Sequence, residues 1–81
     1  MRITKKEIEF RTQIVNDTLK DLLGDNAPMV NIAGRYGYNA IELNNGIETI
    51  VTCLTKSQAY DCLMTASRLL YLVKKGGYAI D

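Results

Sequence analysis

The strongest constraint on this fold is a helix-capping pattern that opens a long run free of helix breakers. Thr4 is followed three residues later by Glu7, which is the spacing of a capping box. Residues 5–23 contain no glycine or proline, and Gly24 follows as a stop. We therefore expect a helix over residues 5–23. At about 100° per residue, its core-facing stripe comprises Ile8, Val15, Leu19, Leu22 and Leu23.

A second segment repeats this pattern further along the chain. Thr55 precedes Gln58 by three positions, and Gly76–Gly77 ends the run. We expect a helix from Lys56 to about Lys75. Its apolar side chains fall into a core arc and a second stripe about 100° round from the centre of that arc. The core arc comprises Ala59, Cys62, Leu63, Ala66, Leu69, Leu70 and Val73, and the second stripe comprises Tyr60, Met64 and Tyr71.

The segment between the helices has the pattern of β-strands. Val30 and Ile32 alternate with polar or small residues, "YNAIEL" leads to "NNG", and "IETIVTCL" follows. Asn45–Gly46 favours a tight hairpin turn. A three-residue loop with a bulge at Gly46 is the alternative, and it would shift the register by one residue. The register therefore stays open, as does the choice of which pair faces the core, Ile41 and Leu43 or Ala40 and Val51.

This order predicts an α+β fold. We expect a helix, a two- to three-stranded antiparallel β-meander and a helix (α-β-β-β-α), with both helices on one sheet face. The other face would be open to solvent or to a partner. The 81 residues should form a single domain, 1–81. A domain of this size buries only about 60% of its unfolded surface, so we expect marginal stability.

The sequence offers little for catalysis or metal binding. It has no histidine, the commonest general base and metal ligand. Cys53 and Cys62 should be inert, because two thiols without histidine do not form a structural zinc site within one chain. Glu42 and Glu48 could approach each other across the hairpin, but we expect both to be solvated. We predict that the protein is not an enzyme and has no catalytic residue, metal or cofactor.

Charge and hydropathy limit the partners and the location. Ten Lys/Arg against nine Asp/Glu give a net charge of +1, too little to draw in a polyanion from a distance. No signal peptide or membrane-spanning run is visible, and the longest apolar-rich stretch is residues 69–73. We expect a cytoplasmic protein with reduced cysteines. A small-ligand site stays open, although so small a domain leaves little room for a pocket of about 300 Å³.

The element order resembles that of the double-stranded-RNA-binding domain. The resemblance implies phosphate contacts from a basic segment at the start of the second helix. The matching segment here, "TKSQAYD" (55–61), supplies Lys56 but not the lysine cluster of that family. The segments "YGYNAIEL" and "LTKSQAYDCL" also resemble small orphan proteins of bacterial phages and mobile elements. That second resemblance implies no residue roles.

Surplus apolar side chains favour a protein-interaction module. Phe10 and Ile14 form a patch outside the core stripe of the first helix, and Tyr60, Met64 and Tyr71 lie off the core arc of the second. Contiguous apolar patches mark partner surfaces, where aromatic residues and methionine are enriched. We therefore predict a non-enzymatic module that forms a homodimer or binds an unknown protein partner. The alternative is that these side chains complete the core.

The alternative function is nucleic-acid binding. Tyr36 and Tyr38 are two residues apart, so they would share one strand face and could stack on bases. Basic side chains would contact phosphates, provided that the basic ends of the chain converge on the tyrosine face. The candidate contacts are Arg35, Tyr36, Tyr38, Lys56, Lys74 and Lys75.

Overall fold

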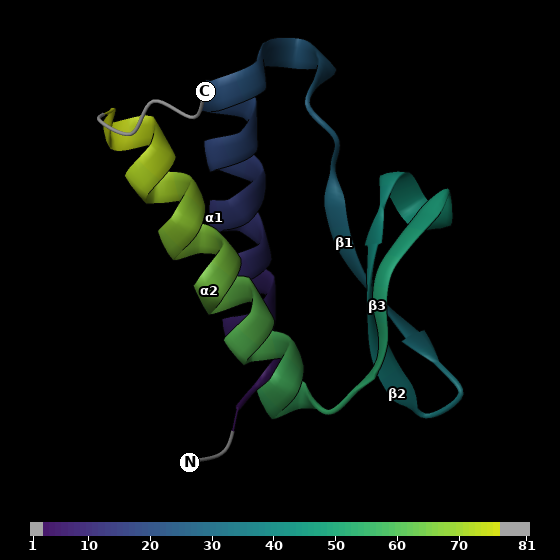
Figure 1. Ribbon diagram of the computed structural model, residues 1–81. Helices are drawn as coiled ribbons and strands as arrows, with labels where there is room; N and C mark the ends of the chain where they lie inside the picture. Colours follow the sequence, from purple (N-terminus) through teal and green to yellow (C-terminus); the bar gives the residue numbers. More distant parts are fainter. Residues whose placement is uncertain (1–2, 77–81) are drawn as a thin grey trace.

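The computed structural model describes residues 3–76, except for the side chains of Arg35 and Cys53. The elements follow in the order α1 (Lys5–Leu23), β1 (Val30–Arg35), β2 (Tyr38–Leu43), β3 (Glu48–Leu54) and α2 (Lys56–Lys75). The three strands form one antiparallel sheet in the order β1-β2-β3, and both helices pack against it (Figure 1). This confirms the predicted α+β class, with three strands in the meander.

Side-chain caps explain why both helices begin where they do. The Thr4 hydroxyl accepts a hydrogen bond from the backbone N–H of Glu7 at 3.2 Å. At α2 the capping box is reciprocal, because the Thr55 hydroxyl accepts from the Gln58 N–H and the Gln58 side chain accepts from the Thr55 N–H. At the other end, Gly76 has a φ of 92°, a left-handed conformation that suits glycine. The predicted boundaries of both helices are therefore confirmed.

The two hairpin connections differ from the expected ones. Tyr36 and Gly37 join β1 to β2 with φ angles of 54° and 80°, as a tight turn of the I′ type requires. The sequence reading found no turn there. Between β2 and β3, Leu43 pairs with Glu48, so residues 44–47 form the connection. This loop is longer than either alternative considered for Asn45–Gly46.

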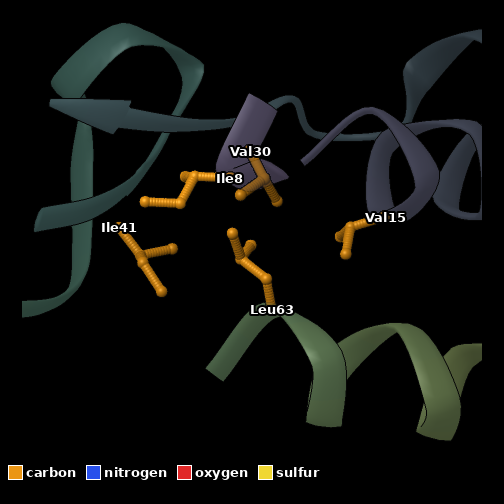
Figure 2. Close-up of a cluster of buried hydrophobic side chains, with 5 residues drawn as sticks. All are labelled: Ile8, Val15, Val30, Ile41 and Leu63. Carbon is orange, nitrogen blue, oxygen red and sulfur yellow. The ribbon is translucent and has the colours of Figure 1, made fainter. Parts of the chain in front are cut away.

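The register places one apolar row under the helices. Val30 pairs with Leu43, Ile32 pairs with Ile41, and Ile41 also pairs with Val51. Partners in an antiparallel pair point to the same face, so this row packs against the core. The open choice is thereby settled: Ile41, Leu43 and Val51 lie together at the core cluster, and Ala40 is also buried, at 1% exposed. The buried cluster comprises Ile8, Val15, Val30, Ile41 and Leu63 (Figure 2).

The helices lie side by side and run in the same direction (Figure 1). Towards their N-termini, the Arg11 guanidinium of α1 lies over the Tyr60 ring of α2. Towards their C-termini, Lys74 Nζ is 2.6 Å from Asp21 Oδ2. Both side chains of that ion pair are about half exposed, so it adds little stability. The two contacts show which faces of the helices meet.

The buried face of α2 is rotated from the predicted arc. Ala59, Leu63 and Ser67 are buried, whereas Cys62 is exposed and Leu69 is 60% exposed. Val73 is also exposed, as is Leu23 at the end of α1. The prediction that these four residues belong to the core is therefore wrong.

The rotation follows from the two neighbours of α2. This helix must contact both the sheet and α1, so its buried face points between them. Ser67 is tolerated there because its hydroxyl donates to the Met64 carbonyl oxygen at 2.9 Å. A prediction based on hydropathy alone places Leu69 in the core and the small polar residue Ser67 at the surface, the opposite of what the structure has.

The sheet face away from the helices is only partly open. Glu42 is 3% exposed there, and the Asn31 side chain donates to its Oε1 at 3.5 Å. Glu42 pairs with Thr49, whereas Glu48 pairs with Leu43 and points to the opposite face. The two carboxylates therefore do not approach each other, and the expectation that both are solvated is wrong for Glu42, whereas Glu48 is exposed. Glu42 lies on β2, the central strand of the sheet, whose pairing with β3 is interrupted by register shifts.

We predict that Leu63→Ala lowers the free energy of unfolding by about 2–5 kcal/mol, because it leaves a cavity in the core. Leu69→Ala is the matched control on the same helix, and we expect it to change stability by about 0.5 kcal/mol or less. Urea unfolding followed by far-ultraviolet circular dichroism measures both. Equal losses in the two variants would contradict the observed orientation of α2.

Candidate functional site

The contact between the helices carries an open groove of about 530 Å³. It lies between α1 and α2, and all of its described lining comes from these helices. Two of the predicted interface residues, Ile14 and Tyr71, take part in the lining. The full lining is Arg11, Ile14, Thr18, Ser67, Arg68, Tyr71 and Leu72.

The predicted interface residues divide into an exposed and a deeper set. Phe10 is 62% exposed and Tyr71 is 58% exposed. Ile14 and Met64 are half-buried, and Tyr60 packs against the core cluster. The expectation that all five lie outside the core is therefore only partly met. We use the name helix-seam patch for Phe10, Ile14, Tyr71 and Leu72.

Arg11 of α1 lies close to two aromatic rings, Phe10 on its own helix and Tyr60 on α2. Its guanidinium carbon lies 5.7 Å from the centroid of the Phe10 ring and 5.9 Å from that of Tyr60. These distances are within the range of cation–π contacts. Sequence reasoning missed Arg11, because an arginine on an amphipathic helix is ordinarily assigned to solvent. The only feature of the sequence that could have indicated a contact of Arg11 with an aromatic ring is its position directly after Phe10.

The apolar run at residues 69–73 adds to the exposed surface. Only Leu70 of this run packs against the core cluster. Leu69, Tyr71, Leu72 and Val73 are all exposed to solvent. Leu72 lines the groove together with Tyr71, although it belongs to neither apolar stripe expected for this helix. A helix segment that is apolar on every side is typical of a buried segment.

The tyrosines proposed for nucleic-acid contact do not share a strand face. Tyr36 lies in the β1–β2 turn and is 99% exposed, whereas Tyr38 begins β2. The expectation of a shared strand face is wrong because Tyr36 belongs to a turn. The sequence did not indicate this turn, since a positive φ is uncommon at a bulky residue such as tyrosine. The side chain of Arg35 lies outside the described part of the structure.

The basic candidates are divided between the two ends of α2. Lys56 is its first residue and lines a groove together with Lys5, the first residue of α1. Lys74 and Lys75 are at the other end, about 28 Å along the helix axis. Lys74 is already paired with Asp21. Nucleic-acid binding by all the candidates required the basic ends of the chain to lie near the tyrosines, and Lys74 and Lys75 do not meet this requirement.

A second groove, of about 470 Å³, lies between α1 and β1. At one end, the Asn16 side chain binds both outward backbone groups of Val30. The Val30 N–H donates to Asn16 Oδ1 at 2.7 Å, and Asn16 Nδ2 donates to the Val30 carbonyl oxygen at 2.9 Å. No sequence pattern singled out Asn16, which lies within a helix beside the core stripe. Both grooves are open to solvent along the surface.

The described residues contain no cluster of three or more His, Cys, Asp or Glu side chains able to hold a metal ion. Neither described helix has the length and apolar character needed to cross a bilayer. Comparison with known proteins found no matching family model, no similar curated protein and no similar solved structure. The two grooves and the exposed side chains around them are therefore the features that bear on function.

We predict that Asn16→Ala lowers the free energy of unfolding by about 1–3 kcal/mol, because two backbone groups of Val30 lose their partner. Gln13→Ala is the matched control, since the Gln13 amide bonds only to exposed Asp17 on the same helix. Its expected cost is about 0.2–0.5 kcal/mol. Urea unfolding compares the two, and equal costs would show that the Asn16 contact contributes no more than a surface pair.

Proposed function

We propose that this protein is a non-enzymatic interaction module that self-associates through the helix-seam patch. The observation that carries the proposal is the exposed aromatic ring of Tyr71 in the groove between the two helices, together with the exposed Phe10, which lies one turn before the groove residue Ile14 on α1. Aromatic residues that flank a groove are typical anchors of a protein interface.

The C-terminal half of α2 supports the same proposal. Residues 69–73 are apolar on all sides, and most of their side chains are exposed in a single chain. Association along α2 would remove Tyr71 and Leu72 from water. Each square ångström of apolar surface so buried contributes about 25 cal/mol.

Charge favours a second copy as the partner. Arg11 and Arg68 line the groove, and Glu7 and Asp61 lie one and two turns before them on the same helices, so like surfaces carry both signs of charge and can meet without a net repulsion. The net charge of the whole chain is only +1, which also favours association. A domain of this size gains stability when it pairs.

The location belongs to the proposal as well. Cys62 is an exposed free thiol, and free thiols are typical of reducing compartments. The exposed thiol of Cys62 supports our proposal that the protein is cytoplasmic.

The dimer is tested by size-exclusion chromatography with light scattering. We expect the wild-type protein to elute with a mass of about 18 kDa, twice the 9.1 kDa of one chain. Leu72→Glu should elute as a monomer with an unchanged circular-dichroism spectrum, because it places a charge in the patch. Ile47→Glu is the matched control, since Ile47 is exposed in the β2–β3 loop and lies outside the patch.

Two results would overturn the proposal. A wild-type monomer across the accessible concentration range would remove self-association altogether. A dimer that persists in Leu72→Glu but dissociates in Ile47→Glu would place the interface on the sheet end of the molecule.

Nucleic-acid binding is the second candidate function. The observation that favours it is the fully exposed Tyr36 ring, on the turn that follows Gly34, together with the groove that Gly34, Lys5 and Lys56 line. An exposed aromatic ring with nearby lysines is the arrangement that binds single strands without sequence preference. Lys74 and Lys75 lie at the opposite end of α2 from Lys56, which argues against a nucleic-acid contact surface that includes all of the basic candidates.

We expect any such binding to require Tyr36 and Lys56 together. A mixed nucleic-acid pool at low salt should shift the elution of the wild-type protein, and rising salt should reverse that shift. Tyr36→Ala should weaken the shift, whereas Tyr71→Ala should leave it unchanged. No shift at low salt would exclude this function.

A further inference from the structure

The edge strand β1 presents a regular row of backbone groups to the groove beside α1. Antiparallel residues alternate between those bonded to the partner strand and those whose N–H and C=O point away. The turn at Tyr36–Gly37 makes Arg35 and Tyr38 a bonded pair, and the register runs without interruption to Val30. Val30, Ile32 and Gly34 therefore turn their N–H and C=O groups outward, away from β2.

One of these three positions is already paired in the manner of a sheet. The Asn16 amide both accepts from the Val30 N–H and donates to the Val30 carbonyl oxygen, as a peptide unit of a neighbouring strand would. No described side chain does the same for Ile32 or Gly34. Both of these residues line the groove of about 470 Å³ between α1 and β1. The open space therefore lies where a further strand would continue the sheet.

The opposite edge of the sheet is built differently. The pairing of β2 with β3 shifts register beside Asn39 and again beside Ile41, which marks bulges in the ladder. Bulges twist an edge away from further pairing and are a common protection against it. β1 has no such irregularity. Of the two edges, β1 is the one suited to receive another strand.

The charge at one end of the groove indicates what kind of strand fits. Lys5 and Lys56 both line the groove, and Glu9 is the only acid in its described lining. The lysines are the first residues of their helices, where the macrodipoles add positive potential. From Asn16, the groove leads past Ile32 and Gly34 towards these lysines, because α1 and β1 run in opposite directions (Figure 1).

We propose that β1 binds an extended, acidic peptide segment of another protein by β-strand addition in this groove. The main chain of the segment pairs with Ile32 and Gly34, and an acidic side chain lies near Lys5 and Lys56. Main-chain pairing of this kind supplies affinity, while side-chain contacts supply selectivity. The groove uses the side of α1 that carries Thr12 and Asn16, whereas the helix-seam patch uses the side that carries Ile14. The two surfaces are therefore separate.

Gly34 provides a sharp test because its N–H points outward. Proline is tolerated on an edge strand where the N–H faces solvent, so Gly34→Pro removes one donor while the ladder with β2 is kept. A Cβ at Gly34 would meet no atom within 4 Å, so Gly34→Ala fits as the matched control with the N–H retained. Circular dichroism and urea unfolding first establish that both variants fold.

The probe is a displayed library of short random peptides, selected on the full-length protein. We expect enrichment of peptides with acidic residues and a strand-like alternation of β-branched side chains. The best peptide, made synthetically, should bind Gly34→Pro about tenfold more weakly than the wild type and bind Gly34→Ala equally well. Lys56→Glu and rising salt should both weaken binding.

Methylation of single backbone nitrogens in the peptide gives a second readout. Loss of binding at every second position would show strand pairing, because alternate N–H groups of an added strand point towards β1. Failure to enrich any peptide, equal binding by Gly34→Pro and the wild type, or exclusive binding of a mixed nucleic-acid pool at the lysine end would overturn the proposal.

Discussion

The packing around Leu63 is the contact on which the rest of the fold depends. This side chain is 2% exposed and touches a cluster to which α1, β1 and β2 each contribute (Figure 2). Each element supplies only one or two residues to the cluster, because a chain of this length cannot build a thicker core. Once α2 is oriented to place Leu63 there, its remaining apolar residues must face elsewhere. The exposure of Leu69 and Tyr71 is therefore a consequence of the core.

Asparagine side chains extend the backbone pairing of this small sheet. Asn44 Oδ1 accepts from the Met29 N–H, Asn31 Oδ1 accepts from the Asn45 N–H, and Asn39 Nδ2 donates to the Leu54 carbonyl oxygen. Asn16 does the same for Val30 from α1. Strands of six or seven residues leave many end groups without a strand partner, and amide side chains satisfy them at low cost in space.

The elements of the fold could be read from the sequence because their signals are local. The pairs Thr4–Glu7 and Thr55–Gln58 fix the helix starts within one turn of chain, and glycine marks the ends. The orientation of α2 could not be read in this way, because it depends on where α1 and the sheet lie. The burial of Ser67 and Glu42 has the same origin: both side chains are placed by neighbours distant in sequence. Asn16 was missed for that reason, since its partner Val30 is fourteen positions away.

The helix α1 gives the two proposed surfaces a common support. Its residues near Ile14 face α2 and the helix-seam patch, and Asn16 faces the groove beside β1. Both surfaces rest on the packing of Ile8 and Val15, so a loss of core stability would weaken both together. The contacts themselves are independent, because no described residue lines both grooves. Occupation of one groove should therefore leave the affinity of the other unchanged unless it alters the stability of α1. The proposed second copy and the proposed extended segment would therefore bind on different sides of α1.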